Sequence, residues 1–152
     1  MTGKGNTKNW RFSGNIYTPL TRITSSNYTT YGTVDSSGNL RINLESTKNS
    51  IQIESIPNTY KQKITLPDPE DSELGCEITI LNISGSQIQF INSRIYNGSV
   101  NSGSVGPLFL ENNEFVKLKV IYFGGDVEMN IYIVTGGGST ARERGKLPAQ
   151  LP

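Results

Sequence analysis

The sequence predicts an all-β protein, a β-sandwich or jelly-roll-like domain with extended N- and C-terminal arms. Apolar and polar residues alternate in short runs along most of the chain, as they do in strands with one buried face. Apolar residues at the helical spacing i, i+3, i+4, i+7 do not persist anywhere, so long amphipathic helices are not expected. Gly, Ser, Thr and Asn are abundant and favour turns, while the Ile content, 7 Tyr and 5 Phe suit strands.

The N-terminal half contains a short strand, a hairpin and a further strand. "GNIYTPL" is a short strand that ends at a proline. "YGTVDSSGNLRINLES" reads as a hairpin in which "DSSGN" supplies the turn. The residues expected on one face of this hairpin are Val34, Leu40, Ile42 and Leu44. "SIQIESI" then alternates cleanly, which puts Ile51, Ile53 and Ser55 on one face.

The C-terminal half contains the stronger strand patterns. "YKQKITLP" precedes an acidic loop, and "GCEITILNIS" follows that loop as a strand with a "SGS" turn into "QIQF". The residues expected on one face of "GCEITILNIS" are Cys76, Ile78, Ile80 and Asn82, with Cys76 as an inert core residue. "FVKLKVIYFGGDVEMNIYIV" reads as a second hairpin, with strands from Phe115 or Val116 and from Val127 to Val134.

A chain of 152 residues has the length of one ordinary domain. We expect an N-terminal arm over residues 1–13 and a sandwich over residues 14–135. The sandwich could divide into sub-modules at 14–60 and 61–135, because the first part is thinner in apolar residues. The tail over residues 136–152 begins with consecutive glycines and is expected to be flexible.

Charge divides unevenly between the termini and the middle of the chain. Residues 1–11 hold three bases and no acid, and residues 139–152 hold three bases against Glu143, which leaves 8 bases and 12 acids between them. Either the tails are merely solvated, or they dock on an acidic partner surface. The residues assigned to docking are Lys4, Lys8, Trp10, Arg11, Arg142, Arg144 and Lys146. No signal peptide, transmembrane helix or nucleic-acid-binding pattern is predicted, and one cysteine fits a reducing cytoplasm.

The sequence predicts no catalytic residues, no cofactor and no metal. Histidine is absent, which removes Ser-His and Cys-His nucleophilic systems and histidine zinc sites. A glycosidase would need paired carboxylates, and both candidate pairs lie beside turns, where acids are ordinarily solvated. Those pairs are Glu111 with Glu114, and Asp126 with Glu128.

The loop "PDPEDSE" is the best candidate for a calcium site. Carboxylate and hydroxyl oxygens are the ligands that calcium prefers, and here they come from Asp68, Glu70, Asp71, Ser72 and Glu73. The EF-hand pattern is missing, and Pro67 and Pro69 restrict the geometry. A solvated connection between strands is therefore the favoured interpretation.

Three tyrosines in Asn/Ser/Gly-rich segments could form a sugar-binding platform. An exposed aromatic ring packs on the apolar face of a sugar, and neighbouring amides bind its hydroxyls. The candidates are Tyr28, Tyr31 and Tyr96. The favoured interpretation is that these rings anchor their loops to the core.

Residues 63–134 resemble a module common in tailed-bacteriophage virion proteins, especially head-fibre and tail-fibre proteins. The matching segments are "ITLP", "LGCEITILNISGSQIQF" and "FVKLKVIYFGGDVEMNIYIV". In that family a strand ending in Leu-Pro leads into a Gly-x-x-Ile-Thr-Ile-x-Asn strand with a Ser-Gly turn. The closing strand of the family frequently carries a tryptophan. This chain departs from that pattern, because Tyr132 is the only aromatic residue in its closing strand.

The resemblance implies a non-enzymatic virion structural protein, a capsid-attached decoration or head-fibre subunit assembled in the host cytoplasm. It further implies a homotrimer, attached to phage capsid or tail proteins through a terminal segment. The alternative function is a carbohydrate- or receptor-binding module of a fibre that contacts a host surface glycan.

Overall fold

The computed structural model describes residues 19–57, 62–96, 108–124 and 128–137. They form ten strands, one short α-helix and two 3₁₀ helices, so the all-β prediction is confirmed. The helical elements are α1 (Tyr28–Tyr31), η1 (Leu44–Ser46) and η3 (Asp71–Glu73). The strands are β2 (Leu20–Ile23), β3 (Gly32–Val34), β4 (Leu40–Ile42), β5 (Ser50–Ile53), β6 (Lys63–Thr65), β7 (Glu77–Asn82), β8 (Ile88–Phe90), β9 (Leu108–Leu110), β10 (Glu114–Gly124) and β11 (Glu128–Gly137).

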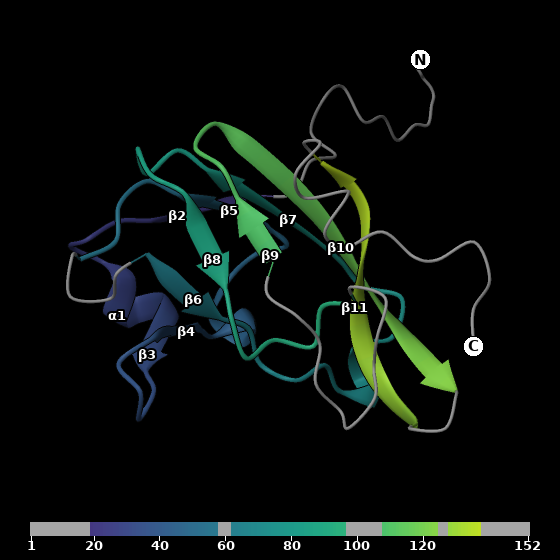
Figure 1. Cartoon of the computed structure of the whole chain (residues 1–152). Coiled ribbons are helices and arrows are strands. Elements are labelled where there is room, and N and C mark those ends of the chain that lie inside the picture. The colour runs from purple at the N-terminus through teal and green to yellow at the C-terminus, as the bar shows by residue number, and fades with distance from the viewer. Residues whose placement is uncertain (1–18, 58–61, 97–107, 125–127, 138–152) are drawn as a thin grey trace, which may run out of the picture.

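The strands form two mixed five-stranded sheets (Figure 1). One has the order β11-β10-β7-β5-β2 and is called the long-strand sheet below; the other has the order β3-β4-β6-β8-β9. The pairs β2–β5, β5–β7, β4–β6 and β6–β8 are parallel. The pairs β7–β10, β10–β11, β3–β4 and β8–β9 are antiparallel.

The parallel pairs arise because the chain crosses between the sheets at each step from β4 to β8. Strands β4, β6 and β8 lie in one sheet, and β5 and β7, which alternate with them along the chain, lie in the other. Each strand therefore pairs with the next one in its own sheet by a crossover, the connection that parallel strands need. Ile64, for example, is the partner of both Leu40 and Phe90 in the register.

Both sheets contribute to one hydrophobic core. Its buried residues alternate along the strands, as in Ile51 and Ile53 of β5 and Ile78 and Ile80 of β7. Tyr132 of β11 is fully buried in the same core. The predicted alternation is thus confirmed for Ile51 and Ile53 and for Ile78, Ile80 and Asn82. It does not extend to Ser55, because β5 ends at Ile53 and Ile56 is buried instead.

A second, smaller cluster lies on the other side of the β10–β11 hairpin. Tyr96, Phe123, Met129 and Ile131 form it, and the rings of Tyr96 and Phe123 lie 5.8 Å apart in a tilted arrangement. The backbone N–H of Tyr96 donates to the carbonyl of Tyr132 at 2.9 Å. The segment ending at Tyr96 is thereby fastened along β11.

The two predicted hairpins are present. β3 and β4 pair around the turn at residues 35–39, and β10 pairs with β11. Val34 is exposed and Leu44 lies in η1, so those two do not extend the buried face that Leu40 and Ile42 form. Both sheets combine strands from either side of residue 60, so residues 14–60 and 61–135 share sheets rather than each building its own. The predicted arms, 1–13 and 136–152, lie outside the described residues except for Gly136 and Gly137, which end β11.

Candidate functional site

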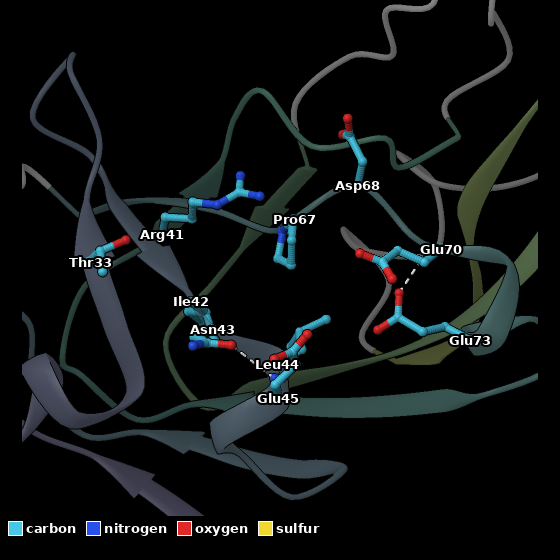
Figure 2. A pocket seen from close by; sticks show the side chains of 10 residues that line it. All are labelled: Thr33, Arg41, Ile42, Asn43, Leu44, Glu45, Pro67, Asp68, Glu70 and Glu73. Atoms are coloured by element: carbon cyan, nitrogen blue, oxygen red, sulfur yellow. Dashed lines mark hydrogen bonds between the residues drawn. The ribbon is translucent and has the colours of Figure 1, made fainter.

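A cavity of about 330 Å³ lies between the β3–β4 hairpin and the acidic loop that follows β6 (Figure 2). One wall comes from Thr33 and Arg41 of that hairpin. The floor comes from the segment 42–45, which runs from β4 into η1. The opposite wall comes from the loop, through Pro67, Asp68, Glu70 and Glu73.

The cavity carries mixed charge with an acidic excess. Arg41 reaches in from one side, and Figure 2 shows the carboxylates of Glu70 and Glu73 on the other side. Asp68 and Glu45 bring the carboxylates to four against one guanidinium. Thr33 and Asn43 add a hydroxyl and an amide.

The acidic wall is held in place by hydrogen bonds to the last strand. The Tyr132 hydroxyl donates to the carbonyl of Pro67 at 2.7 Å, and Asn130 Nδ2 donates to Asp71 Oδ1 at 2.8 Å. Arg94 forms an ion pair of 3.4 Å with Asp68. The loop that follows the short β6 is therefore fixed at several points by residues far along the chain.

Within the loop, η3 orients the two glutamates. The Glu73 carboxylate accepts from the backbone N–H of Glu70 at 2.7 Å, and the Glu73 N–H donates to the Glu70 carbonyl at 2.9 Å. This reciprocal arrangement is the usual way to satisfy backbone donors at a helix start. Glu73 thus has a structural partner as well as a position on the cavity wall.

The opposite wall is ordered by Asn43. Its side-chain oxygen accepts from the N–H of Glu45 at 3.0 Å and so caps η1. Its own N–H donates to the Tyr31 carbonyl at 2.7 Å. Among the described residues, the side chains of Arg41 and Glu45 form no hydrogen bond or ion pair, so both remain available to a ligand.

The arrangement suits hydrogen bonding to a polar or cationic group. No group of three or more His, Cys, Asp or Glu side chains that could hold a metal ion occurs in the part of the chain that the structure describes. The oxygen groups weighed as calcium ligands have partners within the protein: Asp71 binds Asn130, Asp68 pairs with Arg94, and Glu73 binds the backbone of Glu70.

The tyrosines proposed for sugar binding do not form one platform. Tyr28 and Tyr31, both in α1, are partly buried and pack against the core. Tyr96 follows the favoured interpretation, in which the ring anchors its loop, because it is only 1% exposed. Its ring packs on Phe123 and offers no face to a sugar. The residues assigned to docking lie outside the described residues: Lys4, Lys8, Trp10, Arg11, Arg142, Arg144 and Lys146.

The expectation that Cys76 belongs to the core is wrong, because Cys76 is exposed. It precedes β7, and its carbonyl accepts from the N–H of Val120 at 3.0 Å. The buried face of this strand therefore begins at Ile78, two residues later than the sequence pattern predicted.

The carboxylates weighed for glycosidic cleavage take part in turn contacts. Glu114 accepts from the N–H of Glu111 at 3.1 Å, and Glu111 accepts from Gln87. Glu128 accepts from the Tyr122 hydroxyl across the end of the hairpin, and Asp126 lies outside the described residues.

The sequence does not predict which residues line the cavity, because their positions look ordinary in the linear pattern. Thr33 and Arg41 look like ordinary outward positions of a hairpin, and Asn43 and Glu45 like the residues after its second strand. Only the approach of the loop from β6, about 25 residues further on, makes a cavity of them.

No family model, curated protein or solved structure matches this chain. None of the helices in the described ranges has the length and apolar character needed to cross a membrane.

Proposed function

We propose that the chain is a non-enzymatic structural protein of a tailed-phage virion, a capsid-attached decoration or head-fibre subunit that docks through its terminal arms. The observation that carries the proposal concerns the strand that resembles the phage module. The glycine, the two isoleucines and the asparagine of its motif support the fold rather than facing a ligand site. That is what a module used as a scaffold requires.

Asn82 gives the clearest case. It is fully buried, and its Nδ2 donates to the carbonyls of Ser86 at 2.8 Å and Leu110 at 3.0 Å. Its Oδ1 accepts from the N–H of Ser84 at 2.9 Å. The motif asparagine thus closes the turn into β8 and ties β7 to β9 of the other sheet.

The motif glycine and isoleucines have comparable roles. Gly75 has a φ of +88°, which favours glycine, and its N–H donates to the Val120 carbonyl at 2.9 Å. Ile78 and Ile80 are buried in the common core. The three segments that carry the resemblance also lie together: β7 pairs with β10, and β6 pairs with β8.

We infer that the domain is a β-sandwich, since both sheets direct buried side chains into one core. The parallel pairs from β2 to β8 distinguish it from a jelly roll, whose sheets are antiparallel. The two arms are the proposed docking segments. Their six bases would be attracted to acidic virion proteins, while the middle of the chain carries an excess of acids.

The proposal is tested on particles purified from cultures that express the chain natively. Immunogold labelling should place the protein on the virion, on the capsid if it is a decoration or head-fibre subunit. Deletion of residues 138–152 should leave the body folded and weaken its docking. If the chain is absent from purified particles, the structural function is wrong; if docking survives loss of both arms, the arms are not the anchor.

The alternative is binding of a host glycan, and the cavity of Figure 2 is the observation that favours it. Carboxylates, an amide, a hydroxyl and the free Arg41 guanidinium offer donors and acceptors to sugar hydroxyls. Glycan binding that is lost on Arg41→Ala and kept on Tyr28→Ala would favour the cavity over the predicted tyrosine platform.

A further inference from the structure

The outward face of the long-strand sheet presents an apolar centre. Phe115 of β10 lies directly opposite Leu81 of β7 in the register, and Ile83 follows two residues later on the same side. Phe115 is 41% exposed and Ile83 is 38% exposed. Leu20 of the edge strand β2, 50% exposed, points to this face as well. Three of the six large exposed apolar side chains of the described residues therefore share one sheet face.

Charges of both signs surround this centre. Lys117 lies opposite Thr79, and Lys119 lies opposite Glu77, one and two rows along the face from Phe115. Arg22 of β2 pairs with Glu54 at the other side of the face. An apolar centre with a polar, charged rim is the composition of protein interfaces. Because both signs occur on the same face, two copies of it can be complementary to each other.

Among the described residues this part of the face is uncovered, whereas Tyr96 covers the same face further along β10 and β11, over Phe123, Met129 and Ile131. None of its outward side chains on β2, β5 and β7 is buried, whereas the residues between them are. The uncovered part spans four strands, β2, β5, β7 and the first half of β10, which lie about 4.8 Å apart and give a width of roughly 20 Å.

We infer that copies of this chain associate through the outward face of the long-strand sheet, with Phe115, Leu81 and Ile83 at the centre of contact. The lysines of one copy then face the carboxylates of another. The association rests on the proposed structural function, because it names the surface by which subunits assemble. The association can be disproved without disproving the structural function, since a chain that is monomeric in solution could still be present on the virion.

The test is the mass of the full-length protein, measured by light scattering on a sizing column. We expect two or three times the monomer mass of 16.7 kDa. Phe115→Lys and Ile83→Lys, made separately, should each weaken association by about tenfold or more, because each places a charge in the apolar centre. Val34→Lys is the matched control: Val34 is 46% exposed but lies on β3 of the other sheet.

A folded far-UV circular dichroism spectrum is required of every variant. Lysine acetylation then locates the contact: Lys117 and Lys119 should be protected in the oligomer, and the exposed Lys48 should not. A dimer or a trimer supports the inference if Phe115→Lys and Ile83→Lys each dissociate it and Val34→Lys does not. A monomeric wild type, an oligomer that survives both face variants, or unprotected Lys117 and Lys119 would overturn it.

Discussion

The hydroxyl of Tyr132 donates a hydrogen bond of 2.7 Å to the backbone carbonyl of Pro67, 65 residues earlier in the chain. Tyr132 is fully buried, and Pro67 opens the acidic loop that forms one wall of the cavity. The closing strand of one sheet therefore positions the loop that leaves the other sheet. A loop with several carboxylates would otherwise be pushed apart by its own charge.

Replacing Tyr132 by Phe should lower the free energy of unfolding by about 1 kcal/mol, because the partly buried carbonyl of Pro67 loses its donor while the ring still fills the core. Urea denaturation followed by fluorescence measures the change. Tyr122→Phe is the control, since the Tyr122 hydroxyl binds Glu128 at an exposed position. Equal losses in both variants would mean that the buried contact adds nothing.

The same tyrosine predicts a dependence of stability on alkaline pH. Burial raises the pKa of the Tyr132 phenol above its ordinary value of 10.0; Glu73 and Asp68 raise it further, and Arg41 opposes them. Above about pH 10 the unfolded chain loses this proton while the native chain keeps it, so the stability that is complete below about pH 10 falls as pH rises.

Denaturation midpoints measured between about pH 9 and pH 11 check this prediction. Other tyrosines and lysines also titrate in this range, so the wild type is compared with Tyr132→Phe. The decline should be shallower in Tyr132→Phe than in the wild type. Parallel declines in the two proteins would show that Tyr132 does not contribute.

Asn82 predicts the largest loss from a single polar side chain. Asn82→Ala should destabilise the protein by about 2–4 kcal/mol, because the buried carbonyl of Leu110 and the turn at Ser84 lose their partners together. Asn112→Ala is the matched control: Asn112 is exposed and accepts one hydrogen bond, from Gly85. Thermal unfolding of both variants decides, and a loss for Asn82→Ala no larger than for the control would contradict the structural role of the motif.

The strands and their buried faces could be predicted from the sequence, because period-two alternation is a local property of a strand. Ile51, Ile53, Ile78 and Ile80 all face the core as expected. The parallel partners could not be predicted this way. Ile64 pairs with Leu40 and Phe90, each about 25 residues away, and alternation says nothing about which strands meet.

Two placements that the local sequence does not indicate have the same origin. Tyr96 lies in an Asn/Ser/Gly-rich segment that locally favours exposure, yet the apolar outer side of the β10–β11 hairpin buries it. Cys76 continues an alternating pattern, yet it precedes the strand and lies beyond the core. The cavity depends on two segments that approach each other only in the folded chain, so its Arg41 carries no sequence signal.

Gly137, near the end of β11, predicts a steric effect that its neighbour lacks. Its φ is +138°, and a Cβ there would lie 2.5 Å from the carbonyl oxygen of Phe115 on β10. Gly137→Ala should therefore cost about 1–3 kcal/mol and loosen the pairing of Val116 with residue 137. Gly136→Ala is the matched control, because its Cβ would meet only the Lys117 side chain at 3.5 Å. Hydrogen exchange of the β10 amides near Phe115 should accelerate in the first variant alone; equal exchange in both would show that the close approach is not required.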